Sequence, residues 1–203
     1  MTAESLLRTV AAALDAAGIP FMLTGSVASA YHGAGRATMD IDLVIDPLPD
    51  HLDAFVQTME ASGMYASDVA ARGALADRSM FNVIDPQSGW KVDLIVRKLR
   101  PFSEEEFARR QSVDFFGVRL QVATVEDVIL SKLEWAKLGA SARQLEDVAA
   151  LVRLHGEEID RAYLDRWIAT LGVGSQWEAA LKMLPKGDAF WRRATGLLGY
   201  QRE

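Results

Sequence analysis

The residues best suited to chemistry in this sequence are three aspartates in two predicted strands. Asp40 and Asp42 lie one residue apart at the start of an apolar segment, and Asp93 lies in a second apolar segment. Side chains alternate between the two faces of a strand, so Asp40 and Asp42 point to the same side. Carboxylate oxygens are the ligands that Mg²⁺ prefers, and clustered carboxylates repel one another without a cation. The pattern therefore predicts a divalent-metal site, although a D-x-D motif taken alone also occurs on exposed strands without function.

A glycine-serine turn precedes the D-x-D strand and predicts a phosphate-binding site near it. Gly25 and Ser26 follow a short predicted strand, and a run of small residues that can form a helix comes next. Backbone N–H groups and a hydroxyl at such a turn bind phosphate oxygens at close range. The sequence contains no P-loop motif, and only the start of the dinucleotide-binding glycine motif is present, at Gly33.

Composition restricts the class of protein and the kind of metal site. The chain has 203 residues, a net charge of −6, no cysteine and three histidines. These values exclude disulfides and cysteine zinc sites, and they leave oxygen as the expected metal ligand. An acidic chain does not attract nucleic acid over its whole surface. Five basic residues form local clusters that we interpret as solvated charge flanking a helix: Arg97, Lys98, Arg100, Arg109 and Arg110.

The sequence shows no targeting or membrane-spanning segment. No apolar run approaches the ~20 residues of a membrane span, and Glu4 stands where a signal peptide would be basic. We therefore expect a cytoplasmic protein with no membrane partner.

Hydrophobic periodicity predicts an α+β core, residues 1–123, followed by a packed helical region, residues 124–203. The predicted elements of the core are a helix ending at Gly18, strands Phe21–Leu23 and Asp40–Ile45, a helix between Pro49 and Gly63, and strand pairs within Ser79–Val96 and Ser112–Val122. The predicted helices of the C-terminal region are Val125–Leu138, Ala142–Leu154, Arg161–Leu171 and Gln176–Leu184.

Three local expectations depend on weaker patterns. The segment Tyr65–Arg78 has weak periodicity and is expected to be mostly loop. Ser103 and Glu106 have the spacing of a capping box at the start of a short helix. Four tryptophans are expected in the core of the helical region rather than as base-stacking residues: Trp135, Trp167, Trp177 and Trp191.

The turn, the D-x-D strand and the third carboxylate together resemble the DNA polymerase β-like nucleotidyltransferase superfamily. The matching residues are Gly25 and Ser26, Asp40 and Asp42, and Asp93. The string from Arg36 to Ile45 is similar to smaller bacterial members, the abortive-infection and toxin–antitoxin nucleotidyltransferases of the AbiEii type. This resemblance implies a nucleotidyltransferase-type mixed sheet flanked by helices, followed by a helical region that completes the nucleotide site.

The resemblance to the AbiEii type continues into the helical region. That group has a hydrophobic-x-x-x-Lys motif and then an R-D-x-x-D-L motif, and the matching residues here are Lys132, Arg143 and Asp147. Gln144 replaces a carboxylate of the second motif, and Ser141 replaces a usual aspartate. Taken without the resemblance, these positions are also those of a surface lysine and an ordinary i,i+4 ion pair.

The resemblance implies a Mg²⁺-dependent nucleotidyltransferase with a two-ion site, for which Mn²⁺ is the alternative ion. Asp40, Asp42 and Asp93 would hold the metal and act in catalysis. The residues implied for nucleotide binding are Gly25, Ser26, Arg36, Lys132, Arg143 and Asp147. A nucleoside monophosphate would pass from a nucleoside triphosphate to a hydroxyl of tRNA or another RNA, a protein or a small molecule. A toxin role with an antitoxin partner belongs to the same expectation.

Two other functions stay open from the sequence. A catalytically silent nucleotide-binding or regulatory module on the same fold is favoured by the altered second motif. A metal-dependent phosphohydrolase fits the clustered aspartates but leaves the glycine-serine turn unexplained.

Overall fold

The computed structural model describes residues 2–115 and 117–185 of the chain. Its contacts define two compact units: unit 1 comprises residues up to 31 and 35–124, and unit 2 comprises residues 32–34 and those from 125 onward. Unit 1 contains the strands of the sheet, and the described part of unit 2 is helical. The end of the predicted C-terminal region, residues 186–203 with Trp191, lies outside the described residues.

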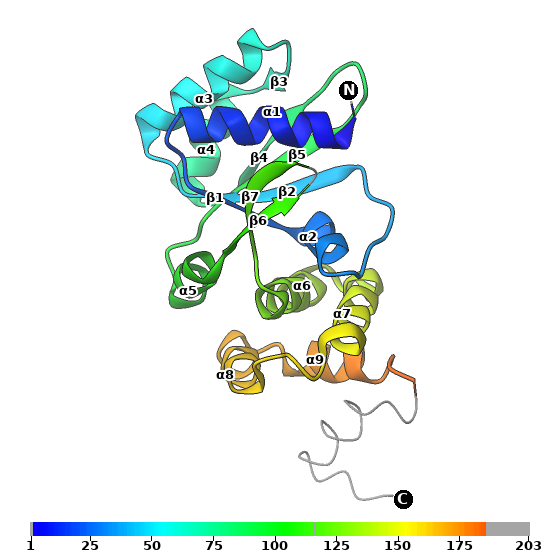
Figure 1. The fold of residues 1–203 in the computed structure, drawn as a ribbon. Helices are drawn as coiled ribbons and strands as arrows, with labels where there is room; N and C mark the ends of the chain where they lie inside the picture. Colours follow the sequence, from blue (N-terminus) through cyan, green and yellow to red (C-terminus); the bar gives the residue numbers. More distant parts are fainter. Residues whose placement is uncertain (1, 116, 186–203) are drawn as a thin grey trace, which may run out of the picture. The chain divides into compact units, whose positions relative to one another are not determined.

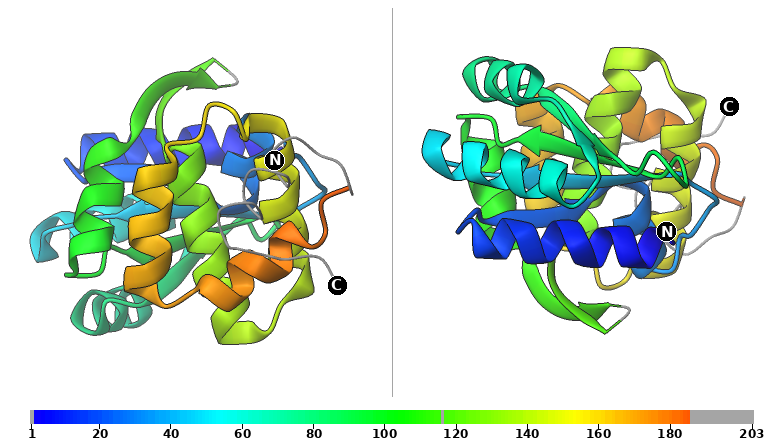
Figure 2. Two further views of the ribbon diagram at one scale, coloured as in Figure 1. Left: turned by 90° about the horizontal axis from the view of Figure 1, so that it is seen from below. Right: turned by 90° about the horizontal axis from the view of Figure 1, so that it is seen from above.

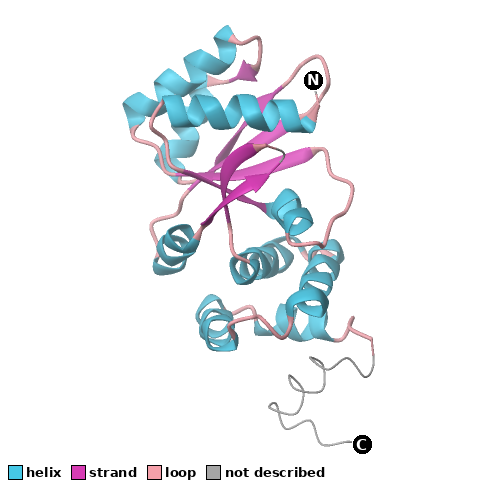
Figure 3. Cartoon of the chain, viewed as in Figure 1, coloured by secondary structure: helices cyan, strands magenta, loops and turns pink. Residues whose placement is uncertain are grey.

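One mixed sheet of seven strands forms the centre of unit 1, drawn in magenta in Figure 3. Its strands are β1 (Phe21–Thr24), β2 (Asp40–Ile45), β3 (Tyr65–Ala66), β4 (Met80–Ile84), β5 (Lys91–Val96), β6 (Gln111–Phe115) and β7 (Val118–Val122). They lie in the order β3-β4-β5-β2-β1-β7-β6. The pairs β2–β5 and β1–β7 are parallel, and the other neighbours are antiparallel. The predicted α+β class, mixed sheet and two strand pairs are confirmed.

Helices cover both faces of this sheet. The helices of unit 1 are α1 (Ala3–Ala16), α2 (Gly25–Tyr31), α3 (Pro49–Ala61), α4 (Asp68–Asp77) and α5 (Pro101–Arg109). Figures 1 and 2 show α1, α3 and α4 on one face, and α2 and α5 on the other. In β2, Ile41, Leu43 and Ile45 are buried and alternate with partly exposed residues. The predicted alternation places both D-x-D carboxylates on one face of the strand.

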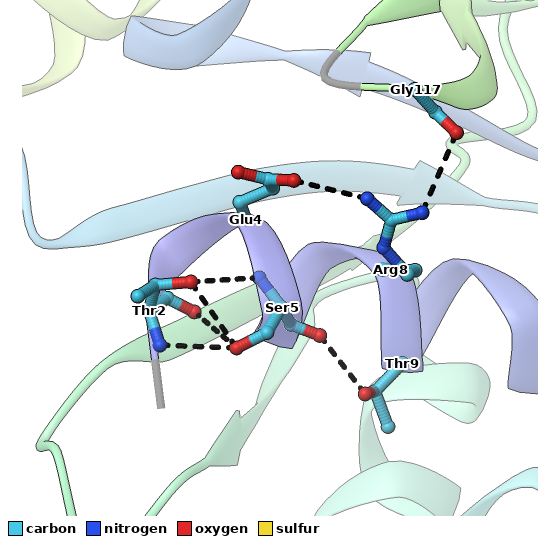
Figure 4. A network of polar contacts seen from close by, with 6 residues as sticks. All are labelled: Thr2, Glu4, Ser5, Arg8, Thr9 and Gly117. Carbon is cyan, nitrogen blue, oxygen red and sulfur yellow. Dashed lines mark hydrogen bonds and ion pairs between the residues drawn. The ribbon is translucent and has the colours of Figure 1, made fainter.

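The first helix begins at a capping box that the structure resolves in detail (Figure 4). The backbone N–H of Ser5 donates to Thr2 Oγ1 at 3.2 Å, and the N–H of Thr2 donates to Ser5 Oγ at 3.0 Å. One turn later, Arg8 donates to Glu4 at 3.0 Å and to the carbonyl oxygen of Gly117 at 3.5 Å. These bonds satisfy N–H groups that a helix start leaves without partners, and Arg8 ties α1 to the turn after β6.

Helix α4 shows that the loop predicted over Tyr65–Arg78 is wrong. The side chain of Ser67 accepts from the backbone N–H of Ala70 and caps the helix, which ends at Arg78 with a left-handed φ of 49°. The inward face carries only alanine, at Ala71 and Ala74, so the hydrophobic periodicity is weak. Alanine has the highest helix propensity and needs no large apolar face to form a helix.

Helix α5 corrects the predicted capping box. The helix begins at Pro101, two residues before Ser103, and its N-cap Arg100 makes no side-chain cap bond. Proline is favoured at the first helical position because its missing N–H would have no intrahelical partner there. Ser103 and Glu106 are buried within the helix, and Ser103 Oγ accepts from Arg100 Nε at 3.1 Å.

The described helices of unit 2 agree with the prediction. They are α6 (Val125–Gly139), α7 (Ala142–His155), α8 (Arg161–Leu171) and α9 (Gly174–Leu181). Trp167 and Trp177 are buried as expected, but Trp135 is 50% exposed, so its assignment to the core is wrong. In the described ranges, no helix has both the length and the hydropathy needed to span a membrane.

Candidate functional site

A row of polar side chains crosses four neighbouring strands of the sheet in unit 1. Asp42 of β2 lies opposite Asp93 of β5 in parallel register. On the outer sides of this pair, Thr24 of β1 lies opposite Asp42 and Asn82 of β4 lies opposite Asp93. Register partners point to the same face of a sheet, with strands about 4.8 Å apart. The strand pairing therefore brings together two carboxylates that lie far apart in the sequence.

Asp93 is held on both of its oxygens. Only 6% of the residue is exposed. Asn82 Nδ2 donates to Oδ1, and Lys91 Nζ donates to Oδ2 at 3.1 Å. A buried carboxylate needs such partners because desolvation of an unpaired charge is costly.

Lys91 also lies 3.4 Å from Asp40 Oδ1, so its ammonium group bridges Asp40 and Asp93. Burial lowers the pKa of Lys91, but its hydrogen bond with Asp93 and the charges of Asp93 and Asp40 outweigh this, and the pKa is raised. Lys91 is therefore the cation of this carboxylate group in the structure. The sequence placed Lys91 on the same face as Asp93, and that i,i+2 spacing was the signal that could have identified it.

Gly25 has two reasons to be glycine. Its φ is 65°, in the left-handed region that residues with a Cβ rarely adopt. A Cβ built at this position would also lie 1.9 Å from Asp42 Oδ2. The carboxylate of Asp42 therefore rests directly on the backbone of the predicted phosphate-binding turn.

Ser26 and Arg36 are brought together beside that turn. Ser26 is buried, and its Oγ accepts a hydrogen bond of 2.6 Å from Arg36 Nη2. The guanidinium group thus lies next to the hydroxyl that the sequence assigns to phosphate binding. Thr24, which precedes the turn, has a buried Oγ1 without a hydrogen-bond partner among the described residues.

The three aspartates are of the right chemical type to bind a divalent metal, since Asp40, Asp42 and Asp93 have carboxylate oxygens. Gly25 leaves the space that the Asp42 carboxylate fills. Within residues 2–115 and 117–185, however, no three histidine, aspartate or glutamate side chains are gathered as a ready metal cage. Lys91 lies between Asp40 and Asp93, where a bound cation would have to replace it.

In unit 2, the two motifs of the helical region meet in a buried ion pair. Lys132 Nζ of α6 lies 2.7 Å from Asp147 Oδ2 of α7 and donates to Gln144 Oε1 at 3.2 Å. The side chains of Lys132 and Asp147 are 3% and 9% exposed. Lys132 is therefore no surface lysine, and Gln144 provides an oxygen to it where the family has a carboxylate. Arg143 is exposed.

The structure thus groups the predicted residues in two sets. Gly25, Ser26, Arg36 and the three aspartates belong to unit 1, and Lys132, Arg143 and Asp147 belong to unit 2. The expectation that both sets bind one nucleotide stays a prediction. Asn82 and Thr24 were not expected, because only the strand register shows that they adjoin the carboxylates.

Solved structures with this fold include nucleotidyltransferases of antibiotic resistance. The solution structure of ANT(2'')-Ia is 14% identical, covers 87% of this chain and 93% of that chain, and has a TM-score of 0.55. A crystal structure of ANT(2'')-Ia with adenylyl-2''-tobramycin is 15% identical, covers 87% and 99%, and has the same TM-score of 0.55. An antigenic nucleotidyltransferase-like protein from Paracoccidioides brasiliensis is 17% identical, covers 93% and 96%, and has a TM-score of 0.53. At these identities the likeness concerns the fold.

A family model gives the more specific result. The model for the nucleotidyl transferase AbiEii toxin of the type IV toxin–antitoxin system matches residues 6–176. A search of the curated proteins found no match. The family match includes the turn, the D-x-D strand, Asp93 and the Lys132–Asp147 pair, and it extends over most of both units. The chain therefore belongs to the AbiEii family of nucleotidyltransferases.

Proposed function

We propose that this chain transfers a nucleoside monophosphate from a nucleoside triphosphate to an acceptor hydroxyl, with Mg²⁺, or Mn²⁺ in its place, held by Asp40, Asp42 and Asp93. One observation carries most weight: Asp42 lies opposite Asp93 while its carboxylate rests on Gly25. Phosphoryl transfer needs metal carboxylates and a phosphate-binding turn side by side. Bound Mg²⁺ would offset the phosphate charge and polarise the phosphorus under attack.

The reaction forms one bond and breaks one. The acceptor oxygen bonds to the α-phosphorus, the bond from the α-phosphorus to the bridging oxygen breaks, and pyrophosphate leaves with the electron pair. In the proposal, Ser26 and Arg36 hold the terminal phosphates, and Asp93 accepts the proton of the hydroxyl. Lys91 engages Asp93 Oδ2 in the structure, so it has to move away before that oxygen can accept a proton.

Unit 2 would supply the remaining nucleotide contacts. The buried Lys132–Asp147 pair fixes the position of Gln144 and the adjoining turn of α7, and the exposed Arg143 lies on that same turn. We propose that Arg143 contacts the nucleotide directly and that Lys132 and Asp147 also take part in nucleotide binding. This assignment follows the family motif.

The acceptor belongs to one of three classes: RNA, including tRNA, a protein, or a small molecule. The family description supports a toxin role with an antitoxin partner. The complex of ANT(2'')-Ia with adenylyl-2''-tobramycin supports a small-molecule acceptor for that protein, and the same chemistry serves any hydroxyl.

A second function is a silent nucleotide-binding module on the same fold. The observation in its favour is that Lys91 already bridges Asp40 and Asp93, which would make a bound metal unnecessary for stability. The replacement of a family carboxylate by Gln144 points the same way.

Labelling separates the two functions. The protein is incubated with Mg²⁺ or Mn²⁺ and each nucleoside triphosphate labelled at the α-phosphate, together with total RNA, cell lysate or a small-molecule extract. We expect label on one acceptor pool with the parent and none with Asp42→Asn. Asp114→Asn, an exposed aspartate of β6, is the matched control and should label normally.

Three results would contradict the proposal in different ways. Nucleotide binding without turnover indicates the silent module. Release of free monophosphate without a labelled acceptor indicates a phosphohydrolase. Equal labelling by the parent and Asp42→Asn means that Asp42 is not part of the site.

A further inference from the structure

Three arginines surround a single carboxylate at the far end of β2. Asp46 directly follows β2, and Arg97 directly follows β5. Arg97 Nη2 lies 2.8 Å from Asp46 Oδ2, and Arg78 Nη1 lies 3.7 Å from Asp46 Oδ1. Arg110 follows α5, and both its guanidinium group and that of Arg97 lie against the ring of Phe107, with guanidinium carbons 4.1 Å and 5.9 Å from the ring centre. We call Arg78, Arg97 and Arg110 with Asp46 the arginine cluster.

The cluster is distinct from the site of the three aspartates. Asp40 and Asp46 stand at opposite ends of the same strand, about 20 Å apart at the usual rise per residue. All members of the cluster belong to unit 1. Ligand binding at the cluster is therefore independent of the proposed nucleotidyl transfer.

Positive charge is in excess in this cluster. Both oxygens of Asp46 are engaged, one by Arg97 and one by Arg78. Arg110 has its guanidinium carbon 4.1 Å from the ring centre of Phe107, and it donates to the carbonyl oxygen of Phe107. Arginine stays protonated in proteins, so the cluster has three positive charges and one negative charge.

Two guanidinium N–H groups of this cluster are buried without an acceptor among the described residues. Among the residues that the structure describes, Arg97 Nη1 and Arg110 Nε are buried and have no hydrogen-bond partner. Burial lowers the pKa of Arg110, and the charge of Asp46 only partly opposes this. A buried N–H without an acceptor is costly, more so on a charged group, so each such group calls for a partner.

We propose that the arginine cluster binds a phosphate group, with oxygens accepting from Arg97 Nη1 and Arg110 Nε. A phosphate dianion matches the two positive charges in excess, and guanidinium groups bind its oxygens through directed N–H bonds. Arg97 is 15% exposed, whereas Arg78 and Asp46 are about one third exposed. The side chains of Arg78 and Asp46 therefore have room to move and admit the ion.

The phosphate has two sources with the same chemistry. One is a free phosphate ion, and the other is the backbone of an RNA. The exposed Lys98 follows Arg97 and would lie next to a phosphodiester chain seated on the cluster. Arg97 departs from the sequence-based interpretation as solvated charge, because its side chain is only 15% exposed, whereas Arg110 is partly exposed and has a buried Nε.

The test measures inorganic phosphate binding at constant ionic strength. In the parent protein, the side-chain N–H resonances of Arg97 and Arg110 should shift with a millimolar midpoint, and chloride should not shift them. Arg97→Met and Arg110→Met should each weaken phosphate binding by roughly tenfold. Arg72→Met removes an exposed arginine of α4 that pairs with Asp53, and as the matched control it should change binding by less than roughly twofold.

The phosphate titration of the parent protein tests the site even if a variant fails to fold. Absence of any shift at tens of millimolar phosphate would overturn the site and assign water to the two buried N–H groups. Equal phosphate affinity in folded Arg97→Met and Arg110→Met would also overturn it. A second experiment titrates a fluorescent single-stranded RNA. Loss of RNA binding in Arg97→Met, together with competition by phosphate in the parent, assigns the site to an RNA backbone. RNA binding that Arg97→Met does not change assigns the site to the free phosphate ion.

Discussion

The two ends of strand β2 carry charged side chains of opposite sign. At its start, the carboxylates of Asp40 and Asp93 share the single ammonium group of Lys91, with Asp42 beside them. Just beyond its end, the guanidinium groups of Arg78 and Arg97 pair with Asp46, and that of Arg110 lies on the same ring of Phe107 as that of Arg97. One end thus gathers carboxylates, and the other gathers guanidinium groups. Under the two proposals, the difference in charge would favour a bound cation at the start of the strand and a bound anion at its end.

The largest expected effect is on catalysis at the acidic end. Asp42→Asn removes a proposed metal ligand with little change in shape and should reduce transfer activity by about a thousandfold. The metal-free variant should melt at the same temperature as the parent or higher, since fewer like charges repel one another. Calorimetry and the labelling assay measure the two effects.

Two results with Asp42→Asn would contradict the proposed metal site. If the variant unfolds, Asp42 is a structural acceptor for the turn at Gly25. If Mg²⁺ with nucleotide raises the melting temperature of the variant as much as that of the parent, Asp42 does not hold the metal.

The buried ion pair Lys132–Asp147 in unit 2 has one charge of each sign, so its stability can be compared with that of both ends of β2. Lys132→Met leaves Asp147 buried without its cation and should destabilise the protein by about 3–5 kcal/mol in urea unfolding. The double variant Lys132→Met with Asp147→Leu should recover part of this loss. Lys137→Met, an exposed lysine of the same helix, is the control and should cost far less. A loss for Lys132→Met no larger than that of the control would show that the pair contributes little.

The basic end should respond to loss of its carboxylate with the opposite sign from the acidic end. Asp46→Asn removes the only negative charge of the arginine cluster and should lower stability by about 1–2 kcal/mol, because the pair is partly exposed. Thermal melts compare it with Asp42→Asn under identical conditions. A higher melting temperature for Asp46→Asn would break the comparison between the two ends.

The smallest effect concerns Lys91. If Lys91 takes the place of a cation between Asp40 and Asp93, Lys91→Met should bind Mn²⁺ more tightly, by roughly fivefold, because the metal no longer displaces an ammonium group. Paramagnetic resonance of free Mn²⁺ measures this without any turnover. Weaker Mn²⁺ binding would instead mean that Lys91 orients the carboxylates for the metal.

What the sequence could predict depended on how local each feature is. The shared face of Asp40 and Asp42 follows from the two-residue period of one strand and needs nothing else. The direct pairing of Asp42 with Asp93 required the register of two distant strands, whereas the carboxylate pattern and the family resemblance predicted only that the aspartates come together.

The sequence did not predict two other features, the burial of Arg97 and helix α4, for different reasons. Arg97 is largely buried because Asp46 and Phe107, from other parts of the chain, contact it, and from the sequence alone it is an ordinary surface charge. Helix α4 was not predicted because alanine forms a helix without a large apolar face, so the hydrophobic periodicity of the segment is weak.

The contact between Gly25 and Asp42 has a consequence for the timing of the reaction. Because the carboxylate rests on the backbone with no room for a methyl group, the turn and the acid form one rigid part. The carboxylate cannot move closer to the turn, and this short spacing is present in the structure without any nucleotide. An active site built this way needs little reorganisation at the moment of transfer, and Gly25→Ala should raise the activation barrier even where the nucleotide still binds.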